Sequence, residues 1–175
     1  IVTLHPNTFS IKETRFEALT LFNTLKKIKN YFFIITSPNN DPGYNITLKV
    51  IKKFTKLFPN KFKFIASFGN KNYLSALRCS NGLIGNSSSG IIEAPSLGTP
   101  AINIGERQKN RYKNPNVINT NFISSEIIKA IKKSQNKSFL KKIGNKKNIY
   151  DNGNAAKKIV DKLKNISLKG ILKKN

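Results

Sequence analysis

The chain has few of the residues on which metal sites, disulfides and membrane spans depend. Its 175 residues include one cysteine, Cys79, one histidine, His5, and neither methionine nor tryptophan. A single cysteine excludes an internal disulfide and a zinc site built from cysteines. No run reaches the length of apolar residues that a transmembrane helix needs. We therefore expect no bound metal, no cofactor and no membrane partner.

The chain also lacks the marks of a secretory leader. It begins Ile-Val-Thr-Leu-His-Pro, without the basic start and long apolar stretch of a signal peptide, and without an initiating methionine. These residues predict a strand that is already under way. We therefore expect the chain to begin partway through a longer protein, located in the cytoplasm.

Acidic residues are scarce, with 8 Asp and Glu against 32 Lys and Arg and a net charge of +24. Such a charge is typical of nucleic-acid-binding proteins. Only four of the basic residues are arginines, however, and arginine is the residue that best matches phosphates and base edges. We interpret the scattered lysines as solvated surface and expect no nucleic-acid partner. The alternative is that lysine-rich helices from Lys129 onward bind RNA or an anionic membrane surface.

Short apolar runs alternate with longer amphipathic ones, a pattern typical of βα units around a parallel sheet. Strands are predicted at 1–4, 31–36, 61–66, 82–85, 101–104 and 116–118. Helices are predicted at 10–30, 45–58, 71–78, 90–97 and 155–165, with further helix between 118 and 155. The predicted fold is α/β, a Rossmann-like parallel sheet with helices on both faces. One domain is expected over residues 1–167, followed by a C-terminal tail at 168–175.

The first predicted helix carries a sequence signal at its start. Ser10 and Glu13 have the S-x-x-E spacing of a capping box. Phe16, Leu19, Phe22 and Leu25 follow at helical spacing, and all four are expected to face the core.

The loop Asn86-Ser87-Ser88-Ser89-Gly90 follows a predicted strand and precedes a predicted helix. Ligands of such sheets bind where strands run into helix N-termini. Small residues let a ligand approach the backbone, and free N–H groups with three hydroxyls favour an anion such as a diphosphate. The alternative is that Ser88 or Ser89 is simply a helix N-cap.

Charged residues close to this loop extend the predicted site. Glu93, one of the few acids, lies one turn into the same predicted helix and suits the two hydroxyls of a ribose, although it could instead compensate a helix dipole. Arg107 and Arg111 follow the strand at 101–104 and offer bidentate contacts to phosphate oxygens, unless they are solvated surface charge.

Two motifs stand out around the serine loop and the arginines: Ile84-Gly85-Asn86-Ser87-Ser88-Ser89-Gly90-Ile91-Ile92-Glu93-Ala94-Pro95 and Ile102-Asn103-Ile104-Gly105-Glu106-Arg107-Gln108. Both resemble motifs in the C-terminal half of hydrolysing UDP-N-acetylglucosamine 2-epimerases. The resemblance extends to Thr3-Leu4-His5-Pro6, to the segment 37–43, to Ser67-Phe68-Gly69 with Tyr73-Leu74, and to Gly153-Asn154-Ala155. Non-hydrolysing relatives carry an Asp-Ser-Gly-Gly type of loop and a double glutamate, which this sequence does not have.

The resemblance implies a role for each matching position. Ser87, Ser88 and Arg107 are expected to hold the diphosphate, Glu93 the ribose, and Phe68 with Tyr73 the uracil. His5 is expected near the diphosphate and the sugar as a catalytic residue, although a lone histidine is more often structural. Further candidates for the site are Ser89, Gly90, Arg111 and Asn39. Asn110 stands where the family usually has glycine, which weakens the match at Arg111.

The same resemblance implies a fold and a reaction for the whole protein. The fold is a GT-B-type pair of Rossmann-like domains, of which this chain is the C-terminal half. The reaction eliminates UDP from UDP-N-acetylglucosamine and hydrates the glucal intermediate to N-acetylmannosamine, a precursor of sialic acid. The expected partners are the UDP-sugar, the missing N-terminal domain and further copies in a homo-oligomer. UDP-N,N'-diacetylbacillosamine as substrate and a GT-B glycosyltransferase remain the alternatives.

Overall fold

A single parallel sheet organises the chain in the computed structural model, which describes residues 1–8, 10–144, 147–151 and 153–166. The strands lie in the order β3-β2-β1-β4-β5-β6, and each neighbouring pair is parallel. Their bounds are β1 (Val2–Thr3), β2 (Phe33–Thr36), β3 (Phe62–Ile65), β4 (Leu83–Gly85), β5 (Ala101–Ile104) and β6 (Val117–Thr120). This order is the doubly wound arrangement of a Rossmann fold, so the predicted fold class is confirmed.

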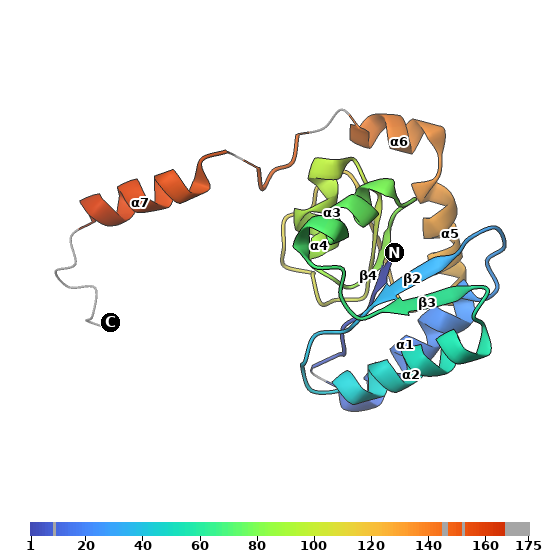
Figure 1. Cartoon of the computed structure of the whole chain (residues 1–175). Coiled ribbons are helices and arrows are strands. Elements are labelled where there is room, and N and C mark those ends of the chain that lie inside the picture. The colour runs from blue at the N-terminus through green and yellow to red at the C-terminus, as the bar shows by residue number, and fades with distance from the viewer. Residues whose placement is uncertain (9, 145–146, 152, 167–175) are drawn as a thin grey trace.

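Helices cover both faces of the sheet (Figure 1). The helices are α1 (Ile11–Leu25), α2 (Tyr44–Leu57), α3 (Asn70–Cys79), α4 (Ser89–Ile92), the 3-10 helix η1 (Ala94–Leu97), α5 (Ser124–Ser134), α6 (Lys137–Gly144) and α7 (Ala155–Asn165). Buried side chains of α1, α2 and α5 form one core with the strands, and those of α3 and η1 form a smaller core on the other face.

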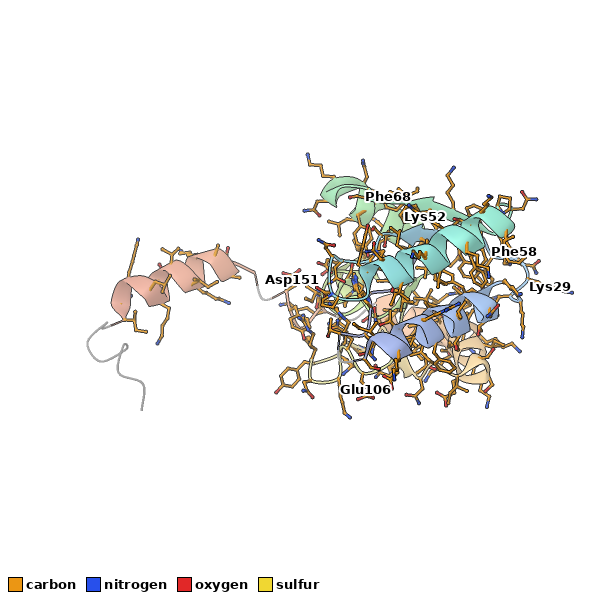
Figure 2. All side chains as sticks on the ribbon, turned by 90° about the horizontal axis from the view of Figure 1, so that it is seen from below. Lys29, Lys52, Phe58, Phe68, Glu106 and Asp151 are labelled. Carbon is orange, nitrogen blue, oxygen red and sulfur yellow. The ribbon has the colours of Figure 1, made fainter. Side chains whose placement is uncertain are left out.

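The larger core contains a cluster of aromatic rings between α1, α2 and the sheet. Phe22 lies with its ring centroid 5.5 Å from that of Phe54 and 6.0 Å from that of Phe62. All three side chains are at most 4% exposed, and burying an aromatic ring of this size contributes roughly 2–3 kcal/mol. Lys29 and Lys52 are exposed on the outer surface of the same layer (Figure 2).

The predicted core face of α1 is wrong at one position. Leu19, Phe22 and Leu25 are packed in the core, but Phe16 is 63% exposed. Steps of three residues advance only about 300° around a helix, so a series with this spacing drifts off the buried face. Ser10 does cap α1 as predicted, because its side chain accepts a hydrogen bond from the backbone N–H of Glu13 at 3.4 Å.

Several predicted boundaries differ from the structure. Helix α1 ends at Leu25 rather than near residue 30, because the chain turns and Asn30 takes a left-handed φ of 63°. The helix predicted at 90–97 is two short helices, α4 and η1, and Pro95 in η1 has no N–H to continue an α-helical ladder. Strand β6 lies one to two residues later than predicted.

Helix α7 has the predicted bounds and stands apart from the sheet (Figure 1). None of its residues is buried, and Ile159, Val160 and Leu163 are all exposed. Over the ranges given above, no helix is long and apolar enough to cross a membrane. The expected tail at 168–175 lies outside the described residues.

Candidate functional site

The strand order places a crevice between β1 and β4. From β1 the chain proceeds to β2 on one side, whereas β4 leads to β5 on the other, so the loops that follow β1 and β4 diverge at the carboxyl edge of the sheet. Such a switch point is where ligands of open α/β sheets bind. The two strands approach closely because Gly85 has no side chain: a Cβ there would lie 1.9 Å from the carbonyl oxygen of Thr3.

Asn86 joins three loops at this crevice. Its Oδ1 accepts a hydrogen bond from the backbone N–H of His5 at 2.7 Å, and its Nδ2 donates to the carbonyl of His5 at 2.9 Å. Its own carbonyl accepts from Nε2 of Gln108, on the loop after β5, at 3.0 Å. Both side chains are at most 3% exposed. Neither Asn86 nor Gln108 is among the predicted site residues. Asn86 could have been found, because it is a polar residue directly after a buried strand.

His5 lies at the end of β1 with its ring held by the loop after β2. Its Nδ1 accepts a hydrogen bond from the backbone N–H of Asn39 at 3.0 Å. Burial, together with the neighbouring charge of Arg107, lowers the pKa of His5 from 6.5 to about 4, against the opposing charge of Asp41. The structure thus brings together His5 and Asn39, two of the predicted site residues, and makes His5 a neutral side chain at pH 7.

Arg107 and Asp41 form an ion pair beside His5. The Nη2 of Arg107 lies 3.6 Å from Oδ2 of Asp41, and both side chains are about one third exposed, at 33% and 35%. Asp41 also accepts a hydrogen bond from Nδ2 of Asn39. The predicted site residues include Arg107 but not Asp41. Acidic residues are scarce in this chain, so an aspartate in a turn-rich loop was a signal that could have identified it.

The serine loop follows β4 at the same edge of the sheet. Ser87 Oγ accepts from the backbone N–H of Ser89 at 3.3 Å, and the hydroxyl of Tyr73 bonds Oγ of Ser89 at 2.8 Å. Ser88 precedes α4, but its side chain makes no capping bond. Within the described ranges, the backbone N–H groups of Ser87 and Ser88 donate to no protein acceptor. The loop therefore offers hydroxyls and unpaired donors to a ligand, whereas a helix of four residues adds little dipole.

Three buried asparagines donate hydrogen bonds to backbone carbonyls of the short helix α4. Asn116 Nδ2 donates to the carbonyl of Gly90 at 3.2 Å, Asn114 Nδ2 to that of Ile91 at 3.2 Å, and Asn148 Nδ2 to that of Ile92 at 2.8 Å. One turn of helix cannot satisfy these carbonyls internally. Sequence reasoning missed all three asparagines, because no local pattern links them to the serine loop.

Glu93 lies next to Tyr73 with part of its carboxylate unpaired. Its Oε2 is buried and accepts no hydrogen bond from the part of the chain that the structure describes. Burial raises the pKa of Tyr73, and the charge of Glu93 raises it further, while hydrogen bonds to Ser89 and Thr3 oppose the shift. The ring of Phe68 lies 6.5 Å from that of Tyr73 at an angle of 49°. The structure therefore groups four predicted residues, Phe68, Tyr73, Ser89 and Glu93.

A cavity of about 660 Å³ opens beside Arg107 and Asn86 at the same edge of the sheet. Arg111 lines it but has no side-chain partner among the described residues. Glu13 and Glu17 of α1 also line it; burial raises the pKa of Glu17 against a hydrogen bond with Asn7, and the charge of Glu13 adds to the rise. Neither glutamate is among the predicted site residues. No cluster of three or more His, Cys, Asp or Glu side chains occurs in the described ranges.

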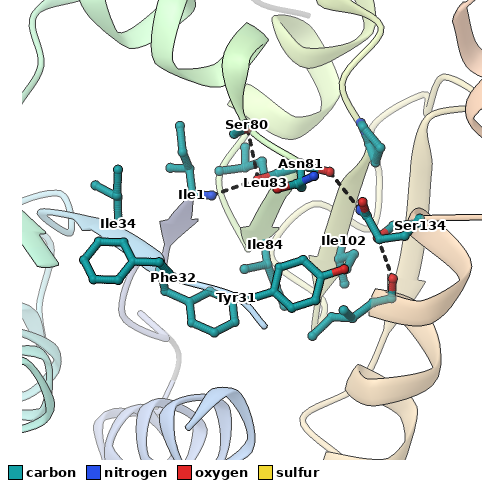
Figure 3. Close-up of a pocket in the computed structure, with 15 residues that line it drawn as sticks. Ile1, Tyr31, Phe32, Ile34, Ser80, Asn81, Leu83, Ile84, Ile102 and Ser134 are labelled. Carbon is teal, nitrogen blue, oxygen red and sulfur yellow. Dashed lines mark hydrogen bonds between the residues drawn. The ribbon is translucent and has the colours of Figure 1, made fainter. Parts of the chain in front are cut away.

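A second cavity, of about 180 Å³, lies at the amino edge of the sheet (Figure 3). The rings of Tyr31 and Phe32 border it together with Ile84 and Ile102. None of the predicted site residues lines it. The polar groups with unused hydrogen-bonding capacity described above thus lie at the carboxyl edge.

Comparison with known proteins shows which family the chain resembles. The family described as UDP-N-acetylglucosamine 2-epimerase matches residues 1–164. The GDP/UDP-N,N'-diacetylbacillosamine 2-epimerase (hydrolyzing) of Campylobacter jejuni is 37% identical over 100% of this chain and 45% of its own length. The polysialic acid biosynthesis protein P7 of Escherichia coli is 36% identical over 89% of this chain and 39% of its own length.

Solved structures show the same fold. The UDP-GlcNAc 2-epimerase of Methanocaldococcus jannaschii, in complex with UDP-GlcNAc and UDP, matches 93% of this chain with a TM-score of 0.65 and 24% identity. The enzyme from Neisseria meningitidis bound to UDP-GlcNAc matches 93% with a TM-score of 0.62 and 22% identity. The chain covers 44% and 43% of these two structures, so it spans somewhat less than half the length of its relatives.

Proposed function

Because the chain belongs to the UDP-N-acetylglucosamine 2-epimerase family, we propose that it is the UDP-binding half of a hydrolysing UDP-N-acetylglucosamine 2-epimerase. The observation that carries the proposal is the meeting of His5, Arg107 and the serine loop at the β1/β4 switch point. The same proposal includes an N-terminal domain that completes the enzyme, a cytoplasmic location and assembly into a homo-oligomer.

The diphosphate is proposed to lie between the serine loop and Arg107. The unpaired N–H groups and hydroxyls of Ser87 and Ser88 are neutral donors for phosphate oxygens. Arg107 supplies the positive charge, and its pairing with Asp41 at 3.6 Å is long and partly exposed. A phosphate oxygen with a full charge and better geometry can compete with such a contact.

The nucleoside is proposed to lie on the side of Glu93 and Tyr73. The buried Oε2 of Glu93 accepts no hydrogen bond from the described residues, and ribose hydroxyls are donors. Phe68 and Tyr73 present two aromatic rings close by, on which a uracil base can stack. The Tyr73 hydroxyl is already bonded to Ser89, so its ring and not its hydroxyl is the group proposed to contact the base.

In the proposed reaction the bond from C1 of the sugar to the diphosphate breaks and its electron pair leaves with UDP. A base removes the proton at C2, which leaves a glucal, and water then adds at C1 while C2 is reprotonated on the opposite face. The groups of this chain stabilise the charge that develops on the departing diphosphate. The base for C2 is proposed to lie in the part of the relatives' length that this chain does not span.

Calorimetric titration of the chain with UDP tests the proposal, with Arg107→Ala and Arg78→Ala compared at low and moderate salt. Loss of a charge-assisted contact is expected to weaken binding roughly ten- to hundredfold in Arg107→Ala. Arg78, on α3, is exposed, and its removal changes the net charge equally without touching the crevice. Equal affinity of the two variants for UDP would refute this assignment of the site.

One alternative substrate has a specific observation in its favour. The C. jejuni relative, which matches the whole chain, is named for UDP-N,N'-diacetylbacillosamine. The intact enzyme, supplied with each UDP-sugar and no acceptor, distinguishes the candidates by its free product. Free N-acetylmannosamine supports the proposed substrate, and release of the diacetylated sugar alone supports the alternative. A requirement for an acceptor would indicate a glycosyltransferase.

A further inference from the structure

We infer that His5 meets its ligand as a neutral hydrogen-bond donor through Nε2, in a tautomer selected by the backbone of the loop after β2. The identity of the ligand, the diphosphate of UDP, rests on the proposed function. The tautomer and its cause rest on the contacts of the histidine itself.

The selecting contact is the bond from the backbone N–H of Asn39 to Nδ1 of His5, at 3.0 Å. A nitrogen that accepts a hydrogen bond uses its lone pair and carries no proton. In a neutral imidazole the other nitrogen then carries it, so Nε2 is the donor. A backbone N–H has no accepting form, and therefore it cannot reverse the bond as a hydroxyl could.

Both partners of this contact are themselves held in place. The backbone N–H and carbonyl of His5 are each bonded to the side chain of Asn86. The side chain of Asn39 is anchored to Asp41 on its own loop. The bond from Asn39 to Nδ1 is the hydrogen bond of the ring among the described residues, and the nearby Oδ1 of Asn39 accepts none, so the proton on Nε2 is available to a ligand.

The charges around the ring favour the neutral form. Arg107, from the loop after β5, and Asp41, from the loop after β2, are the charged groups that face His5. Burial and Arg107 lower the pKa of His5 to about 4, and they outweigh the charge of Asp41 and the side chain of Asn39, which both raise it. The site thus separates two tasks: Arg107 brings the positive charge, and His5 brings one directed donor without a charge.

This state of His5 limits what it does in the proposed reaction. Nδ1 is occupied by Asn39 and cannot take the C2 proton. Nε2 keeps its proton while its hydrogen bond to a diphosphate oxygen strengthens as the C1–O electron pair moves onto the leaving group. UDP therefore departs as the anion, and the proton from C2 goes to a base elsewhere.

Nitrogen-15 NMR of the labelled 175-residue chain tests the tautomer directly, because the chain contains one histidine. At pH 7 we expect Nδ1 to resonate as an unprotonated ring nitrogen and Nε2 as a protonated one. The pattern should persist to pH 5 and change with a midpoint near 4. A population-weighted average of both tautomers, the reverse pattern, or an imidazolium at pH 6 would overturn the inference.

Two variants separate the backbone contact from the nearby charge. Arg107→Met removes the charge and is expected to raise the pKa of His5 while the Nε2–H tautomer persists at pH 8. Asn39→Pro removes the donor N–H and should produce a mixture of tautomers. An amide spectrum of each variant shows whether it is folded. If Asn39→Pro does not fold, the Arg107→Met variant alone tests the inference. Persistence of the Nε2–H tautomer in that variant supports selection by the backbone, and its loss would show that the charge of Arg107 selects the tautomer.

The ligand arm compares His5→Gln with His5→Phe. The Gln amide places a neutral N–H donor near the position of Nε2, whereas Phe has none. We expect His5→Phe to bind UDP about tenfold more weakly and His5→Gln to recover most of that loss. Equal losses would contradict the donor role. If the unaltered chain has the expected tautomer but binds no UDP, the proposed function fails and the tautomer stands.

Discussion

The two edges of the sheet are built by the same strands and differ in chemistry. The cavity of about 660 Å³ at the carboxyl edge is lined mainly by charged and polar side chains, among them Glu17, Arg107 and Arg111. The cavity of about 180 Å³ at the amino edge is lined largely by apolar side chains such as Phe32 and Ile84. Because all strands are parallel, the loops that follow them, with their unpaired polar groups, collect at one edge. Chain direction therefore decides where this fold can bind a polar ligand.

The largest effect on stability is expected from adding a side chain at Gly85, where β1 and β4 approach closely. Gly85→Ala places a Cβ 1.9 Å from the carbonyl oxygen of Thr3, at a φ of 140° that side chains rarely adopt. The strands must separate, and we expect a loss of more than about 4 kcal/mol in unfolding free energy or no folding at all. Urea denaturation measures it. Gly144→Ala, where a Cβ meets nothing within 4 Å, is the control and should be nearly neutral.

Asn86→Ala is expected to rank second. It leaves the backbone N–H and carbonyl of His5 without their partner, which costs about 2–4 kcal/mol of unfolding free energy. Asn81→Ala, at an exposed position beside the amino-edge cavity, is the matched change and should cost less than about 0.5 kcal/mol. Equal costs in the two variants would show that the carboxyl edge is not organised by Asn86.

A smaller effect concerns recognition of the ribose. If Glu93 accepts from the 2′-hydroxyl, the chain should prefer UDP over 2′-deoxy-UDP by about tenfold, and Glu93→Gln should remove most of this preference. Competition binding of the two nucleotides measures the ratio. Phe32→Ser at the amino edge should leave the ratio unchanged. Retention of the preference in Glu93→Gln would assign the ribose to another residue.

The smallest effect is expected from pH. The pKa of His5 is 6.5 as an ordinary histidine and about 4 in the fold, so between these values the unfolded chain binds a proton that the folded chain does not. Folding stability should therefore fall as pH decreases from about 6.5 to about 4. Partial contact with solvent keeps this loss below that of Asn86→Ala. Denaturation curves of the unaltered chain and of His5→Gln isolate the effect, because the carboxylates titrate in both; parallel curves would contradict it.

Much of the fold could be predicted because its signals are local. Apolar runs of four to six residues, helical periodicity and turn residues each act over a few positions, and they located the strands and the order of the helices. The serine loop was found for the same reason. The prediction was wrong at Phe16, where the local pattern allows more than one buried face. The spacing of Phe16 from Leu19 fits a helix face, but α1 does not turn that face toward the sheet, and Phe16 is exposed.

The sequence by itself determined that the chain is a parallel α/β domain with a serine loop after β4, with His5 after the first strand and Arg107 after the fifth. Only the tertiary structure decided which atoms these groups meet. The bond from Asn39 to His5 spans 34 positions, that from Gln108 to Asn86 spans 22, and those between Asn86 and His5 span 81. Strand order creates these neighbours, and it is set by packing of the whole sheet, which no pattern of a few residues encodes.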